Sequence, residues 1–591
     1  MTPALARLGV RRLLLAIHDT SFPSDPGEDV GRGSPATRAA ARLFGYARSL
    51  GFTGIQLGPQ GQTSRDNASP YDGTIFSRHL GCIALASFRD DGPFAGLVSD
   101  RSLARVLVSG GPARHGHAHD AMHELLDEAY DAFVRGARPE LAARLDQFRR
   151  EHAGWLERDA LHAALRDERG TSFRDWPEPD ARLWNPRVGE EAVVAARLAE
   201  LVATHARAIE RYAFGQLLAH AEHARVRTIC AGHRLALYGD LQVGFGAGDA
   251  WVYAAAFLRD YAMGAPPSRT NPDGQPWNYP VLDPDQLAGA ARALVVARVD
   301  KAFAEYDSFR IDHPHGLVCP WVYRRETGDN GAAVRDGARL FESPDLPDHP
   351  ELARFAIAEP AQLDRTLPRH HDHWVRELTA AQIGRYSILF DAIADAAARH
   401  GRSFADLSCE VLSTMPHPLA CVLARHRLGR WRVTQKANLD DPTDVYRTEN
   451  AAPEDWVMIG NHDTPPIFGL IRSWSPAKRD QWARHLTQRL ALRDPQRLEQ
   501  PGFLASAMLA ELFASRAENV SIFFADLFGY EDRFNAPGTY NDVNWTLRLP
   551  HDFEQLHAER LANGLALDIP LALELAQGRS PLSQLSAANP D

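Results

Sequence analysis

Short apolar runs that stop at polar or turn residues recur along the chain. Eight such runs read as strands: residues 11–19, 52–59, 234–241, 307–313, 404–411, 431–438, 455–463 and 521–529. Between them, segments such as TRAAARLFGYARSLG and YSILFDAIADAAARHG place apolar residues three and four apart, as amphipathic helices do. Eight strands that alternate with helices predict an α/β fold, the (β/α)8 TIM barrel.

Three stretches between the predicted strands are too long for simple loops. Residues 95–230, between the second and third strands, are rich in Ala, Arg, Glu and Leu at helical spacing and predict a helical insert. We expect a loop-rich insert at 242–305 and a further insert at 317–400, which closes in a helix. The sequence has no internal repeat or low-complexity linker, so residues 1–591 are expected to form one barrel with these insertions.

The composition of the chain restricts which classes of ligand and which cellular compartment we expect. The formal net charge of -11 disfavours a nucleic-acid or anionic-membrane partner. The five cysteines are scattered and form no CxxC pair, which fits a reducing compartment better than a disulfide framework. The apolar run near the N-terminus is short and is followed at once by His18 and Asp19, so it is a poor signal peptide. We therefore expect a cytoplasmic protein, and the sequence carries no signal of its oligomeric state.

Polar groups gather at the C-terminal ends of the predicted strands, where barrels keep their active sites. The third strand ends in YGD, the fourth in RIDH, the fifth in SCE and the seventh in GNHD. Arg310 and Asp312 lie two apart on a strand and so share a face, where the guanidinium is expected to keep Asp312 ionised. Glu410 stands in the apolar setting LSCEVL, which is expected to raise its pKa and keep it protonated. Asp463, beside His462, places a further carboxyl group at the end of the seventh predicted strand.

Two carboxyl groups whose pKa values are pushed apart suit retaining glycoside chemistry. One carboxylate attacks the anomeric carbon while the other carboxyl group protonates the leaving oxygen. A third carboxylate can hold sugar hydroxyl groups. The alternative is that a buried Arg–Asp pair only supports the barrel core. Carboxylates at three separate strand ends favour the catalytic interpretation.

Several motifs, taken in order, resemble one family over most of the chain. They are FTGIQLGPQGQTSRDNASPYDG (52–73), GDL (239–241), DAW (249–251), GQPWNYPVLDP (274–284), RIDH followed by a Gly, the lone Glu410, GNHD (460–463) and FNAPGTYNDVNW (534–545). This series resembles the amylomaltases, also called 4-α-glucanotransferases or disproportionating enzymes, which are related to the α-amylases.

The resemblance implies a role for each matching residue. Asp312 would be the nucleophile, Glu410 the general acid/base and Asp463 the transition-state stabiliser. Arg310 and His462 would support them, and the sugar-binding groove would be lined by Tyr71, Asp240, Trp277 and His313. An aromatic ring offers an apolar face to a sugar, although ordinary packing explains Tyr71 or Trp277 equally well when each is taken singly. The implied substrate is an α-glucan or malto-oligosaccharide, with no cofactor and no metal.

The chain departs from the family pattern near the expected cleavage point. Where the family usually reads Asp-His-Phe-Arg-Gly, this sequence reads DHPHG at 312–316, and Glu410 is followed by VLS instead of Asp-Leu-Gly. Asn278 and Tyr279 stand where Gly and Asn are usual. These changes concern the donor or acceptor more than the reaction.

The residues therefore predict a retaining 4-α-glucanotransferase that moves α-1,4-glucan segments through a glucosyl-enzyme intermediate. One alternative is an amylase-like hydrolase, in which water resolves the same intermediate. Another is a catalytically weakened α-glucan-binding protein, although a binder has no need of Glu410.

A histidine-rich stretch, HGHAHDAMH at 115–123, raises a separate question of metal binding. His119 and His123 are four apart and could share a helix face. We favour a polar surface loop here, because the stretch follows the turn-like SGGPAR.

Overall fold

Eight parallel strands form a nearly closed barrel at the centre of the computed structural model, which describes residues 2–89, 92–269, 271–325, 328–539 and 541–578. The strands pair in the order β10-β11-β12-β1-β2-β3-β6-β9, and each neighbouring pair runs parallel. Their bounds are β1 (Arg12–Ile17), β2 (Gly54–Leu57), β3 (Ala236–Leu241), β6 (Ser308–Ile311), β9 (Ser408–Cys409), β10 (Trp431–Val433), β11 (Trp456–Met458) and β12 (Asn519–Phe523). The predicted TIM-like barrel and all eight of its strands are confirmed.

The seam of the barrel lies between β9 and β10. The backbone N–H of Trp431 donates to the carbonyl of Val411 across 3.2 Å, and its indole N–H donates to Ser408 Oγ at 2.6 Å. Most of the predicted runs extend beyond the strands that form within them, as at β10 and β11. The last run is also displaced: β12 begins at Asn519, and SIFFADLFG continues into the short helix α19 (Phe524–Leu527). That helix is buried like the strand before it, so hydrophobicity alone gives no sign of the change.

Two helices predicted from apolar spacing form as expected. Helix α2 (Arg38–Ser49) is capped by Thr37, whose side chain accepts a hydrogen bond from the backbone N–H of Ala40, and it buries Leu43 and Phe44. Helix α14 (Ile388–Arg399) buries one apolar face and packs against α10 (Ala290–Glu305).

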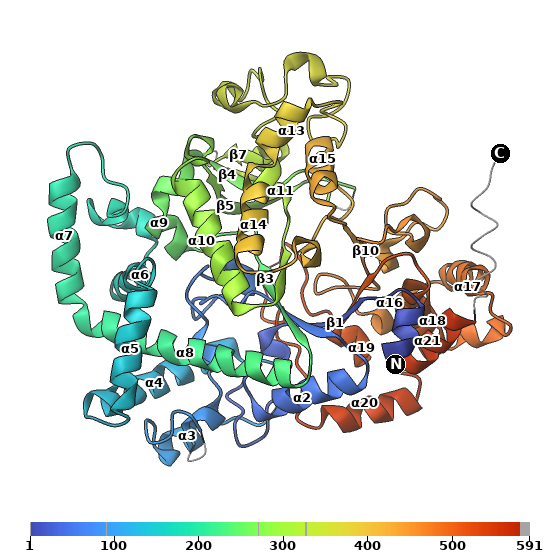
Figure 1. Cartoon of the computed structure of the whole chain (residues 1–591), viewed down its shortest axis with the longest axis horizontal. Helices are drawn as coiled ribbons and strands as arrows, with labels where there is room; N and C mark the ends of the chain where they lie inside the picture. The colour runs from blue at the N-terminus through green and yellow to red at the C-terminus, as the bar shows by residue number, and fades with distance from the viewer. Residues whose placement is uncertain (1, 90–91, 270, 326–327, 540, 579–591) are drawn as a thin grey trace.

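Between β2 and β3 the chain folds as a group of helices on one side of the barrel, at the left of Figure 1. They are α3 (Asp100–Val106), α4 (His115–Val134), α5 (Glu140–Glu151), α6 (Leu156–Arg169), α7 (Glu191–Thr204) and α8 (Ala206–Gly232). The surface-loop prediction for 115–123 is wrong, because this stretch is the first part of α4. Ala118, Ala121 and Met122 supply its buried face, and the histidines between them obscured that period in the sequence.

A second, antiparallel sheet of four strands stands beside the barrel mouth, in the order β5-β4-β7-β8. It consists of β4 (Phe257–Ala265) and β5 (Gln275–Leu282), which arise between β3 and β6, with β7 (Trp321–Arg324) and β8 (Ala338–Arg339), which arise between β6 and β9. The sequence did not predict this sheet. Its strand β5 carries Trp277, one of the predicted site residues.

Other helices complete the chain: α1 (Thr2–Arg7), α9 (Ala247–Val252), α11 (His315–Val318), α12 (Asn330–Arg335), α13 (Ala380–Tyr386), α15 (His417–His426), α16 (Ile467–Ser473), α17 (Pro476–Leu490), α18 (Pro501–Phe513), α20 (Phe553–Ala562) and α21 (Ile569–Gln577). The C-terminal helices α16 to α21 gather on the side of the barrel away from α5 to α7 (Figure 1). None of the helices in the described ranges is long and apolar enough to cross a bilayer.

Candidate active site

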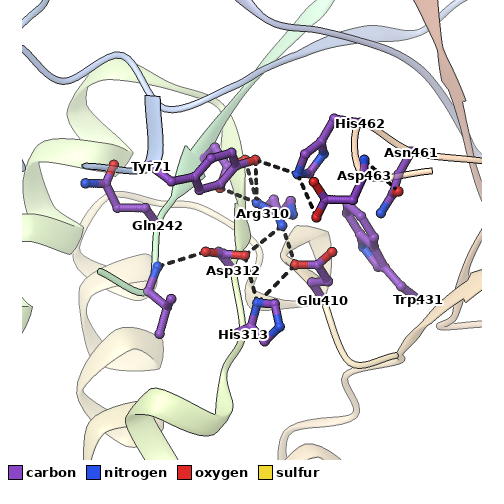
Figure 2. Close-up of polar contacts among 12 residues, drawn as sticks. Tyr71, Gln242, Arg310, Asp312, His313, Glu410, Trp431, Asn461, His462 and Asp463 are labelled. Carbon is purple, nitrogen blue, oxygen red and sulfur yellow. Dashed lines mark hydrogen bonds and ion pairs between the residues drawn. The ribbon is translucent and has the colours of Figure 1, made fainter. Parts of the chain in front are cut away.

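One arginine at the C-terminal end of the barrel holds three carboxyl groups. Arg310 Nη1 donates to both oxygens of Asp240, at 2.7 and 2.6 Å, and Nη2 donates to Asp312 Oδ1 at 2.8 Å and to Glu410 Oε2. Its side chain is 1% exposed and lies over the ring of Trp431, with 4.9 Å from Cζ to the ring centroid. Figure 2 shows Arg310 at the centre of the site, with Asp312 and Glu410 on one side of it. The cation therefore joins the ends of β3, β6 and β9.

Asp312 is buried but favours the ionised form. Its Oδ1 contacts Arg310 and lies 3.1 Å from His313 Nδ1, while its Oδ2 accepts the backbone N–H of Val243 at 3.1 Å. Burial alone would raise the pKa of Asp312, but Arg310 and His313 outweigh it and hold that pKa well below its usual range. The strand pattern anticipated this pairing of Arg310 with Asp312.

Glu410 has the opposite tendency. It is 2% exposed, and burial, aided by the charge of Asp312, raises its pKa to about 8 against the opposing effect of Arg310 and His313. At neutral pH the site therefore holds a carboxylate at Asp312 and a protonated carboxyl at Glu410, as the two sequence contexts predicted.

His313 lies between these two carboxyl groups. Its Nδ1 is 3.1 Å from Asp312 Oδ1 and 3.4 Å from Glu410 Oε2. Burial would lower the pKa of His313, but the hydrogen bond to Asp312 and the negative charge of that carboxylate raise it to about 9, so the ring is an imidazolium at neutral pH. The edge-to-face partner of this ring is Trp277, with centroids 5.0 Å apart. His313 also has a φ of 41°, a backbone conformation that is uncommon outside glycine and that clusters at functional sites.

Tyr71 and His462 form the opposite wall. Their rings stack with centroids 5.3 Å apart and planes 17° apart, and the Tyr71 hydroxyl lies 3.1 Å from His462 Nε2 and 3.3 Å from Asp240 Oδ2. Burial and the charge of Arg310 hold the pKa of His462 well below its usual value, so this ring is neutral.

Asp463 points to the mouth of the site. Its side chain is 32% exposed, close to the 34% of His313, whereas Arg310 and Glu410 are nearly inaccessible. Asp463 Oδ1 accepts a hydrogen bond from Asn535 Nδ2 at 2.6 Å. All nine residues singled out in the sequence thus meet in one place.

Four groups at the site were missed. His18, whose ring lies 5.0 Å from that of His462, follows β1 directly and could have been found by the same strand-end rule. Asn535 lies in FNAPGT, a segment with a clear family likeness. Trp431 and the backbone N–H of Val243 gave no signal, because an apolar strand residue and an amide occur everywhere in a sequence.

Among the residues that the structure describes, two groups of side chains have the donor types of a metal site. In one, a ligand atom from each of Asp312, His313 and Glu410 lies within 4.8 Å of the other two. The Arg310 guanidinium already bonds both carboxyl groups, so the positive charge that they require is supplied by protein. The other group, Glu449, His485 and Glu511, is likewise contacted by Arg489.

Comparison with known proteins agrees with this geometry. A glycoside hydrolase family 77 model, described as 4-alpha-glucanotransferase, matches residues 17–554. The chloroplastic/amyloplastic 4-alpha-glucanotransferase DPE1 of Oryza sativa is 27% identical over 346 residues, which cover 55% of this chain and 54% of that protein. The chain thus spans about half the length of the rice relative. The 4-alpha-glucanotransferase of Chlamydia pneumoniae is 20% identical over 541 residues, covering 88% of this chain and 89% of its own.

A solved structure supports the fold. The amylomaltase of Streptococcus agalactiae, determined in complex with acarbose, superposes with a TM-score of 0.73 at 16% identity, over 96% of this chain and 98% of that one. Because the family model covers most of the sequence, the chain belongs to the glycoside hydrolase family 77 4-alpha-glucanotransferases.

Proposed function

We propose that the protein is a retaining 4-α-glucanotransferase, which moves an α-1,4-glucan segment from a donor to an acceptor sugar. The observation that carries this proposal is the pair formed by Asp312 and Glu410. One favours the ionised form and the other the protonated form, and the two carboxyl groups approach within 4.8 Å. Retaining glycosidases hold their two carboxyl groups about 5–5.5 Å apart, whereas inverting enzymes need about 6.5–9.5 Å for a water molecule.

The reaction has two steps. Asp312 attacks the anomeric carbon, and Glu410 gives its proton to the departing glycosidic oxygen, which leaves a covalent glucosyl-enzyme and a Glu410 carboxylate. In the second step Glu410 takes the proton of an acceptor hydroxyl group. The new glycosidic bond then forms as the bond to Asp312 breaks.

Other residues would support these two groups. Asp463 stabilises the transition state at the mouth of the site, and Arg310 and His462 keep the carboxylates in place. The sugar would lie along Tyr71, Asp240, Trp277 and His313. We assign no cofactor to this chemistry, since proton transfer and the covalent bond are both supplied by side chains.

The substrate class rests on the site and on the family. The Streptococcus agalactiae amylomaltase is known with acarbose bound, which supports an α-glucan or malto-oligosaccharide as the ligand here. The five cysteines are free thiols, four of them buried, which suits a reducing compartment such as the cytoplasm.

Incubation of the purified protein with maltotriose tests the proposal. Transfer predicts both longer and shorter oligosaccharides together with glucose. Shorter products alone would indicate an amylase-like hydrolase, and binding without any product would indicate an α-glucan-binding protein. Asp312→Asn should abolish the products, whereas Asp146→Asn, at an exposed position on α5, should retain them.

A further inference from the structure

A single peptide group joins a buried cation to Asp312. The peptide between Gln242 and Val243 follows β3. Its N–H donates to Asp312 Oδ2 at 3.1 Å, and its carbonyl oxygen accepts a hydrogen bond from Arg298 Nη2 at 2.5 Å. Arg298 and the carboxylate therefore lie at the two ends of one peptide dipole.

Arg298 is a buried cation whose guanidinium lies over the ring of Phe245, with Cζ 5.3 Å from the ring centroid. It is 9% exposed, on α10, and Gln242 O is its one hydrogen-bond acceptor among the residues that the structure describes. Within the same residues, its guanidinium makes no ion pair with a carboxylate. Burial lowers the pKa of Arg298 to about 10, but the side chain stays charged at neutral pH. A buried cation without an ion-pair partner costs several kcal/mol, which an apolar side chain would avoid.

The surroundings strengthen this connection. Arg298 and Asp312 line the same cavity, and the other walls are largely apolar, with Leu241, Phe245, Met263 and Val295 among them. Electrostatic interactions are stronger in such a medium than in water, and hydrogen bonds in series polarise one another.

We propose that Arg298 is a positioning residue that acts on Asp312 through the Gln242–Val243 peptide. The guanidinium draws electron density toward the carbonyl oxygen, so the N–H at the other end becomes a stronger donor to Asp312 Oδ2. Arg310 and His313 hold Oδ1, and the peptide holds Oδ2. Both oxygens of the carboxylate are thereby fixed, and the ionised form is favoured from two sides. The inference rests on the proposed role of Asp312.

Several other titratable or charged groups face Asp312. They are Arg310 and His313 from β6 and its end, Asp240 on β3, Glu410 after β9, Tyr71 after β2, and His462 and Asp463 after β11. The charges of Asp249 and Asp240, besides that of Asp312, favour the charged form of Arg298. Loss of the Arg298 charge leaves these groups in place, so its effect is a change in the pKa of Asp312 rather than loss of the site.

The pH dependence of kcat/KM in the full-length enzyme tests the inference. Arg298→Met should raise the pKa of Asp312, so the acidic limb moves upward by about 0.5–1 pH unit, a three- to tenfold change in the ionisation constant. Arg298→Lys should restore most of the shift. Arg298→Gln, which can still donate a hydrogen bond to Gln242 O, should not restore it. Arg292→Met removes an exposed arginine from the same helix and serves as the control.

A purely structural role would give a different result. The variants would then lose thermal stability or kcat without moving the acidic limb, and that outcome overturns the inference. If Arg298→Met does not fold, the comparison of Arg298→Lys with Arg298→Gln decides the same question. Infrared titration of the carboxyl band that Asp312→Asn removes reads the pKa without any turnover. The inference is therefore tested even if maltotriose is not converted, a result that would refute the proposed function alone.

Discussion

Arg310 holds Asp312 and Glu410 with the same nitrogen. Nη2 donates to Asp312 Oδ1 at 2.8 Å and also to Glu410 Oε2, so the proposed nucleophile and proton donor are joined through one N–H-bearing atom (Figure 2). A sugar that enters between the two carboxyl groups must therefore compete with a charge-assisted contact. The same arrangement makes this cation the electrostatic centre of the barrel end.

Removal of Arg310 should destabilise the protein in a pH-dependent way. Arg310→Met leaves buried carboxylates without their cation, and breaking a buried ion pair costs about 3–5 kcal/mol. The pKa of Asp312 in the folded state, which Arg310 holds low in the unmodified protein, would rise in the variant. The variant should therefore lose stability as the pH rises from about 4 to 7, and acidic pH should relieve much of the loss. Urea unfolding at several pH values measures this. Equal loss at all pH values would contradict it.

Glu410 should set the alkaline limb of activity. It must be protonated to assist the leaving group, and its pKa is about 8, so kcat/KM should fall as the pH rises through that value. Glu410→Gln should lose transfer from maltotriose by several orders of magnitude. The same variant should still form the glucosyl-enzyme from maltosyl fluoride, whose leaving group needs no proton. Failure with the fluoride as well would assign Glu410 another role.

The Tyr71 hydroxyl should matter more for rate than for stability. Tyr71→Phe keeps the ring stacked on His462 but removes the group that contacts Asp240, Arg310 and His462. We expect a loss of about 1–2 kcal/mol in the free energy of unfolding and a lower kcat with KM little changed. Tyr71→Ala removes the ring too, so KM should then rise if the ring binds sugar. Steady-state kinetics on both variants separate the two contributions.

Asn535 should orient Asp463. Its amide donates to Asp463 Oδ1 at 2.6 Å and opposes the rise in pKa that burial causes. Asn535→Ala should lower kcat about tenfold or more, since hydrogen bonds to charged groups contribute about 1.5–3 kcal/mol. Asn563→Ala, at an exposed position just after α20, is the control and should keep full activity. A KM effect alone would indicate that Asn535 binds substrate instead.

The sequence revealed the parts of this molecule that repeat a simple physical pattern. Each barrel strand lies in an apolar run, and polar residues that are costly to bury stand at the ends of several of these strands, so Arg310, Asp312 and Glu410 could be placed together before the fold was known. The β4–β5 hairpin that carries Trp277 has no such regularity, because β4 pairs with β7, which comes from a later segment of the chain. The Val243 amide and the Arg298 contact depend on backbone position, which residue types do not report.

The seam of the barrel gives Glu410 a different mechanical setting from the other proposed catalytic groups. Strand β9 pairs with β6 at only two positions, and in the described part of the chain one main-chain bond, from Trp431 to Val411, spans to β10. By contrast, β1 pairs with β12 at five positions. Separating the barrel between β9 and β10 would break the fewest main-chain hydrogen bonds. Glu410 therefore follows the strand that borders the seam, whereas Asp312 follows β6, which pairs with a strand on each side, β3 and β9.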